Sequence, residues 1–181
     1  DLRSAVVSSA PRSVAAGATW KFVGLQESGS IGRIVLHPTD PNIAWVAAGG
    51  NLWKANAERG VFKTTDGGNS WQKVLYVDTL TGANEIVIDP RNPNVLYAST
   101  YQHLRTVFGY NGGGPGSALW KSDDAGAHGR KLEGGTPTGD SGRVGMPTAR
   151  SRPRPSRAPP RPPPRSAPHR PHTPASHAGP E

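Results

Sequence analysis

The chain contains no cysteine, a single methionine and no long apolar run. Without cysteine it can form neither disulfides nor thiolate metal sites, and its redox compartment stays open. A membrane-spanning helix needs about 18 or more consecutive apolar residues, so the sequence predicts no membrane segment. Residues 1–12 begin with Asp1 rather than methionine and lack the apolar core of a signal peptide, so we expect a fragment of a longer protein.

Acidic residues are almost missing from the C-terminal segment. Residues 147–181 hold twelve prolines, seven arginines and one acid, and they contain no Leu, Ile, Val, Phe, Tyr or Trp. This segment therefore carries +6 of the formal net charge of +8. Since such a composition cannot bury a core, we predict a disordered Arg/Pro-rich tail over residues 146–181. The rest of the chain is nearly neutral, so we expect no nucleic-acid partner.

One stretch, residues 60–75, has the pattern of a β-hairpin closed by a tight turn. An aspartate and a glycine lie between two strand-like runs, and glycine accepts the positive φ that such turns need. The pattern is Ser/Thr, any residue, Asp, any residue, Gly, any residue, Ser/Thr, Trp, which is identified as an Asp-box or BNR repeat. Its fixed positions here are Thr64, Asp66, Gly68 and Trp71.

The same pattern recurs along the chain. A degenerate box begins at Ser13, with Ala15 in place of the aspartate, and the three boxes start 51 and 58 residues apart. Between the boxes, residues 37–48 align without a gap with residues 89–100, each as a Pro-containing turn followed by a strand. The fixed positions of the last box are Ser122, Asp124 and Gly126.

Look-alike segments of about 50 residues with four short strands each are typical of β-propeller blades. We therefore predict an all-β fold, a partial propeller over residues 13–145, with four-stranded blades at residues 29–78 and 82–133. Residues 13–24 would end a preceding blade, and Gly142–Val144 would begin a following one. Propellers have about 4–8 blades. Two blades cannot close the ring, so we expect the remaining blades of a larger propeller as partners.

Four further segments add to the box pattern, and they are Gly32–Asn42, Glu58–Gly68, Gly113–Ser117 and Pro137–Asp140. With these segments, residues 13–145 resemble bacterial sortilin N-terminal-like proteins, often labelled BNR-repeat glycosyl hydrolases. The resemblance covers about three quarters of the chain. It implies an exported protein, extracellular or periplasmic, related to the sortilin ectodomain and to two-propeller xyloglucanases.

Three places depart from that family pattern. Ala15 replaces the first box aspartate, Ala127–Arg130 replace a small residue, Thr and Trp, and the strand expected after Gly145 is missing. Out-of-frame translation of GC-rich DNA yields mainly Arg, Pro, Ala, Gly, Ser and His. Our hypothesis is that the tail is such a translation and that residues 127–130 are a brief frame slip, which retranslation of the nucleotide sequence would test.

Two long loops, expected between the second and third strands of each blade, are the candidate ligand-binding elements. They are residues 49–59 and 101–117, and we expect both on the face that also carries the blade-to-blade connections. Aromatic rings beside hydrogen-bonding groups suit a glycan or a protein ligand. Packing of these rings under their own loops is the alternative. The candidate residues are Trp53, Tyr101, His103, Arg105, Phe108 and Tyr110.

Carboxylates on the same face decide whether catalysis is expected. Glycoside hydrolysis normally needs two carboxylates about 5–10 Å apart. The available acids, Glu27, Glu58 and Asp78, fit no catalytic motif, so no catalytic residue is assigned. The box aspartates are expected to tie off their hairpins rather than to catalyse or bind a metal, and no cofactor or metal site is expected.

Two functions therefore stay open. The first is a recognition propeller that holds a glycan or a protein on its loop face. The second is part of a glycoside hydrolase, similar to the xyloglucanases, whose catalytic carboxylates lie mostly outside this sequence.

Overall fold

The computed structural model describes residues 11–13, 17–134 and 139–146. The chain divides into two units, residues 1–150 and 151–181. The second unit lies wholly outside the described residues, and the predicted tail lies there from residue 147 onward. Everything that follows concerns the first unit. Its described residues form β-strands and one short 3-10 helix, η1 (Gln26–Ser28), joined by turns and loops.

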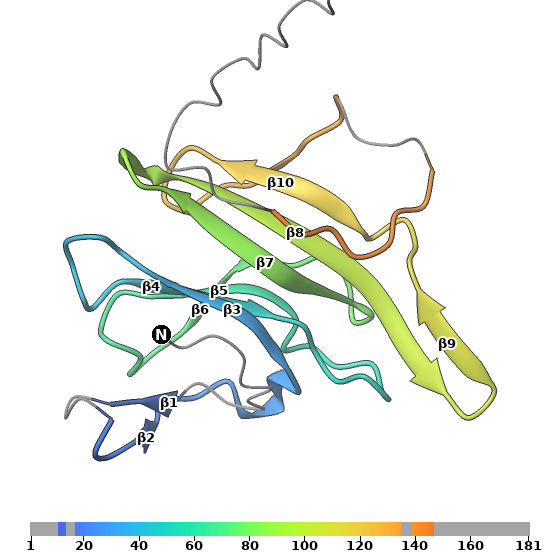
Figure 1. Ribbon diagram of the computed structural model, residues 1–181, viewed down its shortest axis with the longest axis horizontal. Coiled ribbons are helices and arrows are strands. Elements are labelled where there is room, and N and C mark those ends of the chain that lie inside the picture. The colour runs from blue at the N-terminus through green and yellow to red at the C-terminus, as the bar shows by residue number, and fades with distance from the viewer. Residues whose placement is uncertain (1–10, 14–16, 135–138, 147–181) are drawn as a thin grey trace, which may run out of the picture. The chain divides into compact units, whose positions relative to one another are not determined.

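The first blade predicted from the sequence forms a four-stranded antiparallel sheet (Figure 1). Its strand order equals the chain order, and adjacent strands are joined by turns or by the loop of residues 49–59. The Pro-containing turn closes the first hairpin because His37 donates its N–H to the carbonyl of Ile43 at 2.9 Å. The strands are β3 (Ile31–Leu36), β4 (Ala44–Ala48), β5 (Gly60–Thr64) and β6 (Gln72–Leu75).

The second predicted blade forms the other large sheet, again antiparallel, with the order β11-β10-β8-β7. Its register repeats that of the first sheet, since Tyr97 pairs with Val87 and Lys121 as Trp45 pairs with Val35 and Lys63. The strands are β7 (Thr81–Asp89), β8 (Asn92–Thr106), β10 (Ala118–Ser122) and β11 (Arg130–Lys131).

The prediction of a loop over residues 101–117 is wrong for most of its length. Strand β8 runs on to Thr106 and pairs with β9 (Gly109–Gly112), so a hairpin projects beyond the ends of β7 and β10 (Figure 1). The return strand is glycine-rich, which hides it from strand propensity. Gly112 lies opposite His103. A Cβ there would meet the hydroxyl of Tyr101 at 2.9 Å and the ring of Tyr110 at 2.8 Å, so the missing side chain makes room for two tyrosines.

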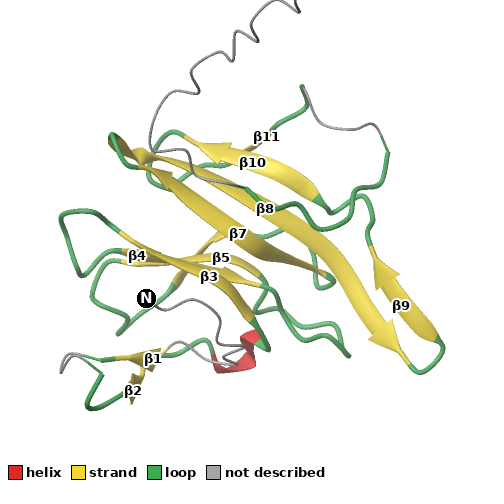
Figure 2. Cartoon of the chain, in the orientation of Figure 1, coloured by secondary structure: helices red, strands yellow, loops and turns green. Residues whose placement is uncertain are grey.

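The two sheets pack face to face, with β7 against β3, β4 and β5 (Figure 2). Side chains alternate between the faces of a strand, and the inward set is apolar on both sheets. Burial of this set supplies the main stabilisation between the blades. The buried core consists of Trp45, Ala47 and Val61 from the first sheet and Ala83, Ile86, Leu96 and Ala98 from the second.

The other face of the first sheet is also apolar. Val46, Ala48 and Phe62 form a second buried cluster with Leu25, which comes from the segment before β3. That segment includes a two-stranded sheet of β1 (Pro11–Arg12) and β2 (Lys21–Phe22). A central blade with two buried faces is what stacking in a propeller requires.

Residues 139–146 were predicted to begin a further blade at Gly142–Val144. They form no named strand among the described residues. They do lie against the second sheet, because Asn84 Nδ2 and Ser99 Oγ each donate to the carbonyl of Val144 at 2.9 Å, and Gly114 forms a β-bridge with Ser141.

Candidate functional site

The turn of residues 64–71 is held by its aspartate. Thr64 Oγ1 donates to Asp66 Oδ1 at 2.8 Å and accepts the N–H of Gly68 at 2.8 Å. Ser70 donates its N–H to Asp66 Oδ1 at 2.9 Å and its hydroxyl to Oδ2 at 2.6 Å. The carboxylate thus accepts from both sides of the turn, which is the use of aspartate that a tight turn favours.

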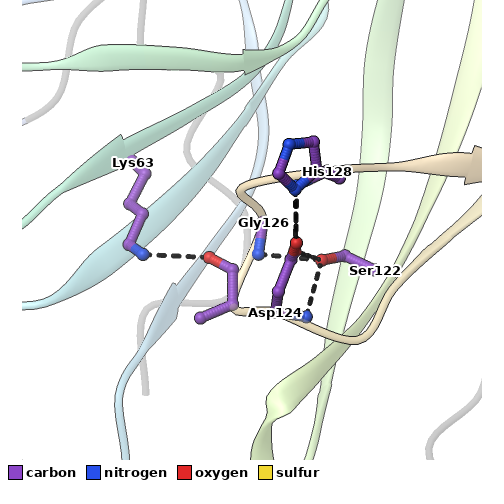
Figure 3. Close-up of polar contacts among 6 residues, drawn as sticks. Lys63, Ser122, Asp124, Gly126 and His128 are labelled. Atoms are coloured by element: carbon purple, nitrogen blue, oxygen red, sulfur yellow. Dashed lines mark hydrogen bonds and ion pairs between the residues drawn. The ribbon is translucent and has the colours of Figure 1, made fainter.

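The turn of residues 122–129 repeats this arrangement with a histidine in place of the serine (Figure 3). Ser122 Oγ donates to Asp124 Oδ1 at 2.7 Å and accepts the N–H of Gly126 at 2.9 Å. His128 donates its N–H to Asp124 Oδ1 at 2.9 Å, and its Nδ1 lies 2.7 Å from Oδ2. The departure at residues 127–130 therefore keeps the hydrogen bonds to the Ser122 hydroxyl and the Asp124 carboxylate. It loses the bond that Asn69 Nδ2 donates to the carbonyl of Asp66 in the first turn, because Ala127 stands at that position.

The degenerate first repeat keeps one bond of the set. Gly17 donates its N–H to Ser13 Oγ at 2.9 Å, as Gly68 does to Thr64. Ala15, which stands at the aspartate position, lies outside the described residues.

Both aspartates have lowered pKa values, because the hydrogen bonds they accept favour the charged form. Bonds from Ser70 hold the pKa of Asp66 well below its usual range, and the N–H of His128 does the same for the pKa of Asp124. Carboxylates that are more acidic in the folded state than in the unfolded chain tie stability to pH.

We expect this link to appear as acid sensitivity. An unfolded aspartate has a pKa of about 3.9, so the stabilisation is fully present above about pH 4 and is lost as the pH falls through the lower folded values. Below about pH 4, the melting temperature of Asp66→Asn and of Asp124→Asn should therefore fall less steeply with pH than that of the wild type. The measurement is thermal unfolding at several pH values, with Asp140→Asn as an exposed control. Equal pH profiles for all variants would contradict the expectation.

The two turns differ at the tryptophan position. Trp71 packs against the cluster formed by Leu25 and its neighbours, and its Nε1 donates to the carbonyl of Val23 at 2.6 Å. In the second turn the equivalent residue is Gly129, and a cavity of about 30 Å³ lies beside it, between the two sheets. The cavity lining also includes Trp45, Val61, Leu75, Ile86, Leu96 and Trp120.

Filling this position should stabilise the fold. A Cβ on Gly129 would meet only Leu75 Cδ1, at 3.9 Å, so a side chain has room to enter. We expect Gly129→Trp to raise the unfolding free energy by about 1–2 kcal/mol, because an indole would bury part of its apolar area there. Denaturant titration measures the change, and Gly134→Trp is the control, since a Cβ there meets nothing within 4 Å. An equal effect of both variants would refute the prediction.

Trp53 and Arg105, predicted on separate loops, come together in the structure. The guanidinium carbon of Arg105 lies 5.5 Å from the centre of the Trp53 ring, and Arg105 donates its N–H to the carbonyl of Leu52 at 2.8 Å. Trp53 remains 61% exposed. A cation over one face of an aromatic ring is attracted by its quadrupole, so the pair joins the two sheets and still presents the indole to solvent.

Tyr101, His103 and Tyr110 form the neighbouring group on the β8–β9 hairpin. Tyr101, His103 and Arg105 are every second residue of β8, so they lie on the same face of the strand. Tyr110 is the cross-strand partner of Arg105. The two tyrosine hydroxyls lie 2.7 Å apart, and the Tyr101 and His103 rings stack with centroids 5.0 Å apart. Tyr110 is exposed, whereas His103 is 8% exposed. The alternative of packing under the loop therefore describes His103 but not Trp53 or Tyr110.

Burial sets the protonation of this group. It raises the pKa of Tyr101 to about 12, together with the hydrogen bond to Tyr110, and it lowers the pKa of His103. At neutral pH Tyr101 is therefore a hydroxyl donor and His103 is uncharged. Phe108, also a candidate, lies apart at the hairpin tip and is 98% exposed.

Arg59 is the residue that the sequence reasoning missed. It is fully buried, and its guanidinium donates to the carbonyls of Gly49 (3.1 Å), Asn51 (2.5 Å), Lys54 (3.2 Å) and Leu80 (2.9 Å). It thereby holds the loop that carries Trp53 against the connection between β6 and β7. The only sequence signal was an arginine directly before a buried strand, where a charged side chain needs a partner.

Two carboxylates of this face, those of Glu58 and Asp78, accept hydrogen bonds. Glu58 Oε2 accepts the N–H of Glu27 at 2.8 Å. Asp78 accepts the N–H of Leu80 at 2.7 Å and the hydroxyl of Thr81 at 3.0 Å. We assign no catalytic pair here. Within residues 11–13, 17–134 and 139–146, no three His, Cys, Asp or Glu side chains are grouped to hold a metal ion. No helix in this part of the chain has the length and apolarity to cross a membrane.

Comparison with known proteins bears on the fold. No protein-family model matches the chain, and no curated protein matches it either. Among solved structures, the chain is similar to an ancestral GH74 enzyme, with a TM-score of 0.53 at 20% sequence identity. The match covers 71% of this chain and 16% of that enzyme, so the chain spans about a sixth of its length. GH74 enzymes are β-propeller glycoside hydrolases, and the two stacked antiparallel sheets are thus part of a β-propeller fold.

Proposed function

We propose that residues 13–145 are part of a glycoside hydrolase-like propeller whose loop face binds a glycan. The observation that carries the proposal is the exposed Trp53 ring, fixed by Arg105 on a surface shared with Tyr110. The likeness to a GH74 enzyme supports the same class of ligand.

The geometry of this face suits a sugar chain. Arg105 lies over the Trp53 ring and holds it in place, and the exposed indole is free to stack on the C–H face of a pyranose ring. The hydroxyls of Tyr101 and Tyr110 offer hydrogen bonds next to it. Sites for small ligands typically combine an aromatic surface with a small number of polar groups beside it.

The experiment is a titration of the full chain with xyloglucan and cello-oligosaccharides by calorimetry. Trp53→Ala should weaken binding about tenfold, because loss of one stacked ring costs about 1.4 kcal/mol. Trp20→Ala is the matched control, since Trp20 is another exposed tryptophan, 52% exposed, but lies on the N-terminal segment. Equal affinities of the two variants would contradict the proposal.

A protein ligand is the second candidate, and the hairpin tip favours it. Val107 and Phe108 are 88% and 98% exposed at the end of the β8–β9 hairpin. An apolar pair at such a tip suits contact with another protein more than contact with a sugar hydroxyl. If glycans do not bind, pull-down with wild type and Phe108→Ala distinguishes this candidate.

The box residues have a structural role in this proposal. The carboxylates of Asp66 and Asp124 close their turns, as expected for Asp-box repeats in sortilin-like and BNR proteins. Any acid and base of a glycoside hydrolase would then come from the remainder of a longer protein.

A further inference from the structure

One backbone carbonyl of the second box turn joins the two sheets. The carbonyl of Ala125 accepts a hydrogen bond from Lys63 Nζ at 3.0 Å (Figure 3). It also accepts one from Trp45 Nε1 at 3.1 Å, and both donors belong to the first sheet. Ala125 has a φ of 57°, which is unusual for a residue other than glycine. Its own N–H is bound to the carbonyl of Asn94 at 2.8 Å. The turn is therefore tied to its own sheet by an N–H and to the preceding sheet by a carbonyl.

The first box turn has the same arrangement. Gly67, at the position of Ala125, has a φ of 72° and donates its N–H to the carbonyl of Asn42 at 2.9 Å. Its carbonyl accepts from Arg12 Nη1 at 2.6 Å. Arg12 directly precedes Ser13, as Lys63 directly precedes the first residue of the next box. In both cases, the cation before one box binds the fourth residue of the following box.

Lys121 occupies this donor position in the second sheet. It directly precedes Ser122, and its Nζ lies 6.0 Å from the centre of the Tyr97 ring, as Lys63 Nζ lies 5.5 Å from the Trp45 ring. Tyr97 and Lys121 are paired across β8 and β10, on the face opposite the buried core. The Lys121 ammonium pairs with the exposed Asp123.

We propose that Tyr97 and Lys121 form the docking site for the box turn of a further blade. The ligand group is the backbone carbonyl of the fourth residue of that turn, held outward by a positive φ. The Lys121 ammonium donates to it, as Lys63 donates to Ala125. Ser99 and Asn84 bind the carbonyl of Val144, so residues 141–146 lie on the inner part of this face. The first strand of a following blade would lie there. This inference is independent of the proposed glycan.

The first experiment uses the chain as it is and measures lysine acylation by mass spectrometry. Lys63 should react about tenfold more slowly than Lys121, because a hydrogen bond from a charged donor is worth about 1.5 kcal/mol or more. Lys54, exposed on its loop, reports the unhindered rate. Equal rates for Lys63 and Lys121 would overturn the proposal, since the contact with the carbonyl of Ala125 would then not protect Lys63.

The second experiment adds a further blade. A copy of residues 79–134 is joined after residue 146, so that a box turn follows the second sheet. Acylation of Lys121 should slow to the rate of Lys63. Lys121→Met should raise the unfolding equilibrium constant about tenfold in the extended chain but little in the original one. A Lys121 rate that the folded extension leaves unchanged would refute the docking site. If the extension does not fold, the comparison of Lys63 with Lys121 in the original chain decides.

Discussion

Replacing Arg59 with methionine should release the loop of residues 49–58 and lower the unfolding free energy by about 3–5 kcal/mol. The guanidinium is fully buried and bridges four backbone carbonyls. Methionine fills a similar volume, but it leaves these acceptors unpaired. Trp53 would then lose its fixed position, so the proposed binding of a glycan should weaken together with stability.

Hydrogen exchange of the loop amides and denaturant titration measure the two effects of the Arg59 variant. Arg59→Lys should recover only part of the loss, since an ammonium cannot reproduce the planar fork of the guanidinium. Arg33→Met is the control, because Arg33 forms an exposed pair with Glu85 at 2.9 Å, and such pairs contribute about 0–1 kcal/mol. Similar losses for Arg59→Met and Arg33→Met would show that the buried network is not needed.

Trp45→Ala should destabilise the chain by about 3–5 kcal/mol, the usual range for removing a large aromatic side chain from a core. Trp45 has no exposed surface, lies between the two sheets and donates its indole N–H to the carbonyl of Ala125. The substitution removes apolar contacts with both sheets and enlarges the cavity already present beside Gly129.

Two further variants separate the contributions of Trp45. Trp45→Phe keeps most of the apolar surface and loses the bond to Ala125, so it should cost about 1–2 kcal/mol. Trp20→Ala serves as the exposed control and should cost less than about 0.5 kcal/mol. Chemical denaturation followed by tryptophan fluorescence and circular dichroism measures all three, and a Trp45→Ala loss no larger than that of Trp20→Ala would contradict the assigned core.

Much of the fold was accessible from local sequence. Residues 44–48 and 60–64 are short apolar runs between turn-forming residues, and both are strands. The Asp-Gly turn after Thr64 and the repeat at Ser122 predicted where each sheet turns back, because turn chemistry depends on a few adjacent residues. Four strands per repeat then followed from the spacing.

The hairpin of residues 101–112 was not accessible in this way. Its return strand contains two glycines among four residues, and its pairing is favoured by tyrosines that meet over Gly112. Strand propensity averages over such contexts, whereas the pairing depends on one particular register.

The candidate site also combines features that local sequence predicts with features that depend on tertiary contacts. The sequence alone determined most strands of the two large sheets and the turns that follow Thr64 and Ser122, because periodicity and turn chemistry act within about ten residues. Only the tertiary structure decided that Arg105 lies over Trp53, that Arg59 holds the loop, and that Lys63 reaches a carbonyl 62 residues further on. Those contacts join elements from different parts of the chain, and they form only when two sheets with complementary apolar faces stack and exclude water.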